Sequence, residues 1–361
     1  MEKPMFAAAA AKRSAARRFP AVLAPAVLAA AAGLAAGCAT RRGPVADAPL
    51  ALWRADAPAR TALVGYVESV TDEKSPDYIP PAGRIAVFDF DGTLFCETDP
   101  TYIDWMVFDH RVLDDPSHHA APEEAEMART ARETGRWPGL SLARERAMAR
   151  AWKGMTPEAL AAYVRRFAET PQPGFSGMKR GEAFYRPMVE AVRFLQSAGF
   201  TVYVCSGTDR MLLRPIVEDG LSLPPRQIIG SDSGLAARAQ NGRDGLEHVY
   251  GKDDELVLGG NLLVKNLQMN KVSAIEREIG VRPVLAFGNS SSDASMLNYT
   301  VQNKRRKAMA FMVLCDDLER EYGNMARADG MRKAAAENGW TPVSMRDDWK
   351  TIYGPGVRRR R

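Results

Sequence analysis

Short apolar runs that end in polar residues recur between residues 85 and 314. Segments with apolar residues at helical spacing separate these runs, for example at 187–197 and 271–279, and a helical tail is expected at 317–325. Strands that alternate with helices of these lengths favour a parallel sheet covered by helices on both faces. We therefore predict an α/β fold with a doubly wound, Rossmann-like parallel sheet. Its predicted strands are residues 85–88, 201–205, 227–229, 283–287 and 309–314.

The long stretch between the first two predicted strands carries little strand pattern. Helical spacing is found instead over 123–134, 140–152 and 157–169. Thr156 followed by Pro157 is a typical helix start, because Thr caps the helix and Pro suits its first turn. The predicted domains are a core of residues 81–100 and 185–361 and an inserted all-helical cap of residues 101–184.

The first 38 residues have the pattern of an export signal. Basic residues end at Arg18, an uncharged stretch rich in Ala and Leu follows, and small residues precede Cys38. This ending resembles the lipobox of bacterial lipoproteins, so we expect residues 1–37 to be a signal peptide and Cys38 to be lipidated. Secretion without a lipid and a retained membrane anchor are the alternatives, since the uncharged stretch is just long enough to span a bilayer. Residues 38–80 then form a tether and docking segment, and we expect a membrane-anchored protein in the periplasm or cell envelope.

The net charge of +5 gives little support to a nucleic-acid partner. Five of the 49 basic residues but only one of the 44 acidic residues lie in the signal segment, so the remainder is close to neutral. We therefore expect no nucleic acid among the partners. The hydrophobic content of 46% predicts a sizeable core.

Three further cysteines, Cys96, Cys205 and Cys315, follow no zinc-binding spacing. We predict that they are small buried residues. A disulfide between Cys96 and Cys205 is the alternative, because both lie near the predicted site.

Two carboxylates follow the first predicted strand. Asp89 and Asp91 are two residues apart, so an extended backbone points them the same way, and Gly92 then turns the chain. Two acids on one side of a strand end can hold a hard cation and divide two tasks between them. One can attack as a nucleophile while the other moves a proton.

Three more polar clusters follow later strands or begin helices. Ser206 and Gly207 come directly after a strand and favour a phosphate cradle. Lys271 opens a helix, where its charge opposes the helix dipole unless it holds an anion, and Lys265 is its rival for this role. The loop from Asn289 to Asp293 follows another strand and can complete an octahedral oxygen site that suits Mg2+.

In this order the four clusters resemble the haloacid dehalogenase-like (HAD) superfamily, and in particular its phosphoserine-phosphatase-like branch. The resemblance covers roughly residues 83–315 and implies a doubly wound core with a helical cap of the C1 type. It implies that Asp89 is the nucleophile that becomes an aspartyl-phosphate and that Asp91 is the general acid and base. The resemblance assigns the remaining roles as phosphate binding by Ser206, Gly207 and Lys271, and metal binding by Asp89, Asp91, Asn289 and Asp293.

The sequence departs from the family pattern at two positions. The metal loop usually begins Gly-Asp but here begins Gly-Asn at Asn289, so either Asn289 or Asp293 is the direct ligand. Glu97 follows the nucleophile by eight residues, one short of the spacing usual in phosphoserine enzymes, so phosphoserine is not assigned as the substrate.

These residues predict a Mg2+-dependent phosphatase that hydrolyses a small phosphorylated metabolite through an aspartyl-phosphate. The presence of Asp91 as a proton donor argues against dehalogenation. A halide leaves without receiving a proton, whereas an alkoxide leaving group needs one. The alternatives are a catalytically degenerate binding lipoprotein, which Asn289 favours, and a phosphotransferase. The candidates for substrate specificity are Glu97, Tyr102, Asp104 and Arg210.

Overall fold

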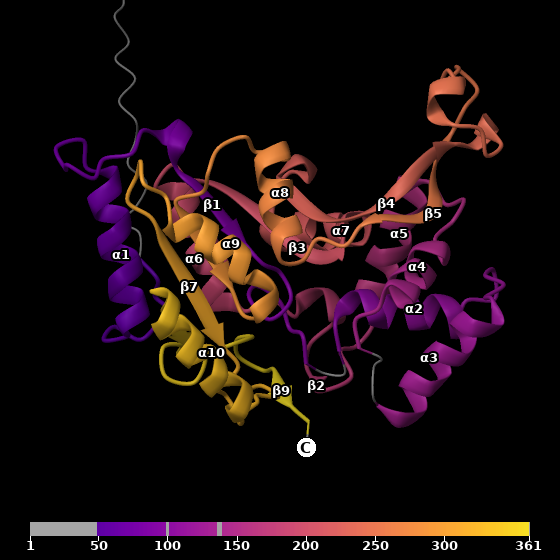
Figure 1. The fold of residues 1–361 in the computed structure, drawn as a ribbon. Coiled ribbons are helices and arrows are strands. Elements are labelled where there is room, and N and C mark those ends of the chain that lie inside the picture. The colour runs from indigo at the N-terminus through magenta and orange to yellow at the C-terminus, as the bar shows by residue number, and fades with distance from the viewer. Residues whose placement is uncertain (1–48, 99–100, 136–138, 361) are drawn as a thin grey trace, which may run out of the picture. The chain divides into compact units, whose positions relative to one another are not determined.

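A seven-stranded sheet forms the centre of the computed structural model, which describes residues 49–98, 101–135 and 139–360. The strand order is β5-β4-β3-β1-β6-β7-β8. Figure 1 labels β1, β3, β4, β5 and β7 of this sheet. The predicted α/β class is confirmed, because all neighbouring strands are parallel except β4 and β5. The strands are β1 (Ile85–Phe88), β3 (Thr201–Asp209), β4 (Ile228–Ala237), β5 (Leu256–Val264), β6 (Leu285–Gly288), β7 (Met309–Leu314) and β8 (Thr341–Ser344), and β2 (Phe175–Ser176) pairs separately with β9 (Arg358–Arg359).

Helices cover both faces of this sheet. Alternate residues of β1 face opposite sides, so Phe88 packs into one apolar cluster and Val87 into the other. The first cluster also contains residues of α1, α6 and α7, and the second contains residues of α8, α9 and α10. The sheet is therefore doubly wound, as predicted. These helices are α1 (Pro58–Thr71), α6 (Arg186–Ser197), α7 (Arg210–Leu221), α8 (Met269–Glu278), α9 (Ala294–Val301) and α10 (Met325–Asn338).

The central strands are held together by a row of aromatic rings. Phe88, Phe287 and Phe311 occupy matching register positions on β1, β6 and β7. Their rings stack with centroid distances of 4.2 and 4.7 Å, and all three side chains are fully buried. Because full burial of one such side chain contributes about 1.5–3 kcal/mol, this row fixes the strands whose ends carry the polar loops.

Four helices are found among the described residues between β1 and β2, where the helical insertion is predicted. They are α2 (Ile103–Leu113), α3 (Pro122–Thr134), α4 (Leu142–Arg150) and α5 (Pro157–Ala168). As predicted, Thr156 caps α5 by accepting a hydrogen bond from the backbone of Ala159. The group packs on the core in two places, since α5 contacts α7 and α4 contacts β5. Whether residues 101–184 act as a separate cap domain remains a prediction.

The predicted helix at 317–325 is wrong. The chain forms a closed loop there instead, because the backbone N–H of Gly323 donates to the Asp317 carbonyl and that of Asn324 donates to the Cys315 carbonyl. The helix begins only at Met325, after Asn324, whose side chain accepts from the backbone of Arg327. The antiparallel strand β5 and the edge strand β8 are further elements that the sequence pattern did not reveal.

The cysteines Cys96, Cys205 and Cys315 are buried and free, so the expected burial is confirmed and the alternative disulfide is wrong. The predicted signal peptide and Cys38 lie outside the described residues. Within the described ranges no helix is long and apolar enough to cross a membrane. The docking segment contains α1, where the Tyr66 hydroxyl donates to the carbonyls of Val284 and Lys307.

A bulge in β3 shapes the second polar loop. Cys205 pairs with Ile229 and Asp209 pairs with Ser231, so the residues from Ser206 to Thr208 loop out opposite a single residue, Gly230. A Cβ atom at Gly230 would lie 2.6 Å from the Thr208 carbonyl oxygen and 2.7 Å from the Arg210 nitrogen. The bulge therefore requires glycine at this position.

We expect Gly230→Ala to lower the free energy of unfolding by about 1–3 kcal/mol, because the added methyl group overpacks against backbone. Gly245→Ala is the control, since no atom lies within 4 Å of a Cβ there. Urea denaturation monitored by circular dichroism measures both. Equal stability of the two variants would contradict the packing argument.

Candidate active site

The carboxyl ends of β1, β3 and β6 meet at a cavity of about 380 Å³. Polar loops follow these three strands, and ligands collect at such strand ends in open α/β sheets. Of the residues predicted from sequence, seven line the cavity: Asp89, Asp91, Glu97, Tyr102, Asp104, Gly207 and Asn289.

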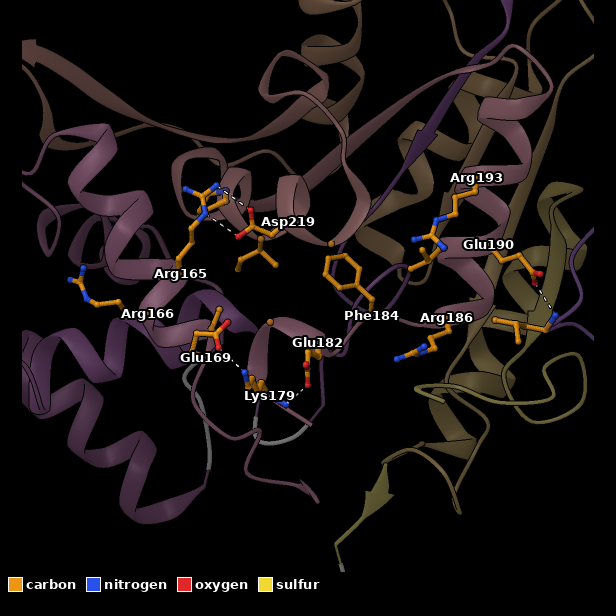
Figure 2. A pocket seen from close by; sticks show the side chains of 17 residues that line it. Arg165, Arg166, Glu169, Lys179, Glu182, Phe184, Arg186, Glu190, Arg193 and Asp219 are labelled. Atoms are coloured by element: carbon orange, nitrogen blue, oxygen red, sulfur yellow. Dashed lines mark hydrogen bonds and ion pairs between the residues drawn. The ribbon is translucent and has the colours of Figure 1, made fainter. Parts of the chain in front are cut away.

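A larger pocket of about 720 Å³ lies among α5, α6 and α7 (Figure 2). None of the predicted site residues lines it. Arg165 pairs with Asp219 and Lys179 pairs with Glu169 across it, so much of its charge is compensated internally. The smaller cavity, where the acids gather, is therefore the candidate active site.

Lys271 is completely buried beneath the cavity and joins two loops. Its Nζ donates to Asp89 Oδ1 and to Asp293 Oδ1, each at 2.6 Å. Burial alone would lower the pKa of Lys271, but the charges of Asp293 and Asp89 outweigh it and raise the pKa. The lysine therefore stays charged. Its rival Lys265 lies 2.7 Å from Glu145 instead.

Asp89 receives only part of the charge compensation that it needs. Burial and the nearby Asp293 raise the pKa of Asp89 to about 7, while Lys271 opposes this shift. A second cation in the cavity would stabilise the ionised carboxylate further.

Asp91 is buried with one oxygen satisfied. Its Oδ2 accepts from the Thr208 hydroxyl at 2.7 Å, whereas Oδ1 has no hydrogen-bond partner. Burial first, and then the charge of Asp104, raises the pKa of Asp91 well above its ordinary value. The environment therefore favours a proton on Asp91, as a general acid requires.

Thr208 also lies at this site, although it is not among the site residues predicted from the sequence. The cap of α7 is Asp209, whose side chain accepts from the Met211 backbone, and this leaves Thr208 to contact Asp91. Ser206 is fully buried and its hydroxyl accepts from the Thr208 backbone at 3.0 Å. Ser206 therefore shapes the loop, while Gly207 and Thr208 reach the cavity.

The two candidate metal ligands in the loop after β6, Asn289 and Asp293, have different surroundings. Asp293 is fully buried, and its Oδ2 accepts from the backbone of Asn289 and of Ser290 at 3.1 Å each. Because Lys271 occupies the other oxygen, Asp293 holds the loop and does not line the cavity. Asn289 lines the cavity and is the better placed of the two for a direct metal contact.

Three of the four specificity candidates line the cavity, and Arg210 does not. The guanidinium of Arg210 donates to Asp232 at 3.1 Å and to Glu278 at 2.7 Å, on the outer side of β4 and α8. Two basic residues from other elements, Arg144 and Lys265, line the cavity and share the buried Glu145. Local sequence carries no signal for that pairing, because the packing of α4 on β5 creates it.

The oxygen atoms present fit a small divalent cation. Among the described residues no group of three His, Cys, Asp or Glu side chains could hold a metal ion, so a cation here would need other oxygen donors, and the Asn289 amide is one that lines the cavity. The unpartnered Oδ1 of Asp91 is a buried polar atom that a proton or, in the ionised state, a cation would satisfy. Carboxylate and amide oxygens are the ligands that Mg2+ prefers.

Residues 86–298, more than half of the chain, match the family model of the haloacid dehalogenase-like hydrolases. No curated protein matches the sequence. Similar solved structures include a protein from Bordetella pertussis Tohama I that is described as having unknown function (17% identity, 72% of this chain and 97% of that chain, TM-score 0.47). Others are cytosolic 5'-nucleotidase IIIB bound to cytidine (13%, 80% and 85%, 0.46) and a phosphoserine phosphohydrolase-like protein from Francisella tularensis (16%, 70% and 98%, 0.36).

We expect Lys271→Met to lower the free energy of unfolding by about 3–5 kcal/mol, because it leaves two buried carboxylates without their counter-charge. Lys307→Met is the control, since Lys307 pairs with Asp77 at the exposed surface and its loss should change little. Urea denaturation at neutral pH measures both. Equal effects of the two substitutions would show that Lys271 does not hold the site together.

Proposed function

Because the chain belongs to the haloacid dehalogenase-like hydrolase family, we propose that it is a Mg2+-dependent phosphatase. It hydrolyses a small phosphomonoester through an aspartyl-phosphate on Asp89. The observation that carries this proposal is the pairing of Asp89, held by Lys271, with an Asp91 whose surroundings favour a proton. A nucleophile and a proton donor on one strand end are what cleavage of a phosphate ester requires.

In the first step the Asp89 carboxylate attacks phosphorus. A bond forms between its oxygen and phosphorus while the ester P–O bond breaks, and Asp91 gives its proton to the leaving alkoxide. Lys271 orients Asp89 from below, and Gly207 and Thr208 line the cavity where the phosphate would lie. The proton on Asp91 favours ester cleavage over dehalogenation, since an alkoxide is a poor leaving group.

In the second step Asp91, now ionised, takes a proton from water. The resulting hydroxide attacks phosphorus, the acyl-phosphate bond breaks, and inorganic phosphate and free Asp89 are regenerated. Asp91 thus returns to its protonated form. The Thr208 hydroxyl keeps the Asp91 carboxyl in one orientation through both steps.

Asp89 and Asn289 are the side chains that would hold Mg2+, and the Asp91 carboxylate would join them only after it has given up its proton. When bound, the ion supplies positive charge that offsets the negative charge of the phosphate oxygens. Lys271 already pairs with two carboxylates, so a cation in the cavity would add positive charge that Lys271 alone does not supply.

The dimensions and lining of the cavity support a small phosphorylated metabolite as the substrate. Tyr102 and Trp105 from the start of α2, together with Leu140, form its outer wall. A cavity of about 380 Å³ matches a small ligand. We propose that residues 101–184 act as a helical cap over this site, as in the phosphoserine-phosphatase-like branch.

The N-terminal segment supports an external location. Its basic start, apolar stretch and Cys38 favour export and lipid anchoring, so the enzyme would act in the periplasm or cell envelope. The near-neutral remainder of the chain supports a metabolite rather than a nucleic acid as the partner.

Hydrolysis of p-nitrophenyl phosphate by the purified full-length protein tests this function. We expect turnover that EDTA abolishes and Mg2+ restores. Asp89→Asn should remove turnover, and Asp91→Asn should lower kcat by about 10²–10⁴-fold because the general acid is lost. Asp72→Asn, at an exposed position beside α1, is the control and should retain full activity. Turnover that persists in Asp89→Asn would overturn the proposal.

A further inference from the structure

The Asn289 side chain is held at both ends of its amide. Its Nδ2 donates to Glu97 Oε1 at 3.0 Å, and its Oδ1 accepts a longer hydrogen bond, of 3.4 Å, from the Thr93 hydroxyl. Only 3% of Asn289 and 7% of Glu97 are exposed. With its nitrogen committed to Glu97, the amide keeps its oxygen as the end that only the longer bond from Thr93 engages.

Glu97 is itself fixed by a cation from a distant part of the chain. Arg327, in the first turn of α10, places its NH1 2.7 Å from the same Oε1 atom. This ion pair holds the carboxylate in place even though burial raises the pKa of Glu97. A single glutamate oxygen therefore accepts from both Arg327 and Asn289.

Gly92 makes the close approach of Asn289 and Glu97 feasible. A Cβ atom at this position would lie 1.9 Å from Asn289 Nδ2 and 2.6 Å from Glu97 Cδ. Gly92 also has a φ of +77°, so a side chain is disfavoured there on conformational grounds too. The turn after the two catalytic aspartates thus leaves a slot into which the amide and the carboxylate both fit.

We propose that Glu97 is a positioning residue, which orients the Asn289 amide so that Oδ1 faces the divalent cation, and that this contact makes asparagine the required residue at position 289. The proposal rests on the phosphatase function proposed above. It replaces the expectation from the sequence that Glu97 contacts the substrate. Arg327 supports this arrangement because its ion pair fixes the Glu97 carboxylate.

The proposal reverses the simple expectation for Asn289→Asp. An aspartate would add negative charge to the metal loop, which taken alone would strengthen cation binding. Here it would place a carboxylate oxygen against Glu97 Oε1, where a hydrogen bond now exists, and the two acids would repel each other. The substitution should therefore weaken Mg2+ binding. Glu97→Gln in the same chain should restore it, because a glutamine can turn its amide N–H towards the new aspartate.

Isothermal titration of the full-length protein with Mg2+ alone measures the effect directly. We expect Asn289→Asp to weaken Mg2+ affinity by about tenfold or more, as the loss of a buried hydrogen bond to a charged group implies. The double variant Asn289→Asp/Glu97→Gln should recover most of that loss. An affinity for Asn289→Asp equal to or tighter than that of the original protein would overturn the proposal.

Two single substitutions of Glu97 distinguish its role as a hydrogen-bond acceptor for Asn289 from the effect of its negative charge. Glu97→Gln keeps an oxygen that accepts from Asn289, so its Mg2+ affinity should fall by less than about threefold. Glu97→Leu removes the acceptor and should lose about tenfold. Equal losses in the two would mean that Glu97 acts only through its charge. Thermal unfolding without Mg2+ checks that both variants are folded.

Kinetics with p-nitrophenyl phosphate distinguish a positioning role of Glu97 from direct contact between Glu97 and the substrate. At saturating Mg2+ we expect Glu97→Leu to recover kcat with an unchanged KM, since only the metal site is disturbed. A raised KM that no Mg2+ concentration corrects would overturn the proposal in favour of substrate contact. An original protein that neither binds Mg2+ nor turns over substrate would refute the phosphatase function itself, and with it this inference.

Discussion

A buried ammonium group shared by two carboxylates is the interaction on which the candidate site depends. Lys271 connects Asp89, after β1, with Asp293, after β6, and all three side chains are buried. Each ion would be costly to bury alone, so the two loops hold their arrangement only together. The backbone N–H groups of Asn289 and Ser290 add to this by donating to Asp293, which fixes the loop after β6 relative to Asp89.

Hydrophobic packing below the ions sets where they meet. The stacked rings of Phe88, Phe287 and Phe311 keep three adjacent strands in register. Asp89 follows Phe88 directly, and Asn289 follows Phe287 by two residues. Small errors in strand register would therefore separate the aspartates from the metal loop. The bulge of β3 opposite Gly230 places Thr208 within hydrogen-bond distance of Asp91. In the same way α10 places Arg327 beside Glu97.

Elements with a strong local pattern were predicted well, and elements that depend on partners were not. The buried run of β1 and the capped start of α5 were recognisable because burial and capping leave local marks in the sequence. β5 alternates poorly and is antiparallel, so neither its presence nor its direction followed from its residues. The helix predicted at 317–325 was wrong for a similar reason, since backbone hydrogen bonds from Gly323 to Asp317 and from Asn324 to Cys315 close a loop and the helix begins only at Met325.

The sequence by itself determined the chemistry: two aspartates at a strand end, a lysine at a helix start and a polar loop after another strand, in an order typical of one hydrolase family. These features follow from residue type and spacing, which fix side-chain chemistry and strand periodicity. Only the tertiary structure decided which oxygens are engaged. It committed Asp293 to Lys271, left Asn289 at the cavity and turned Glu97 towards Arg327. Those contacts join residues far apart in the chain, and because packing alone brings them together, no local pattern could encode them.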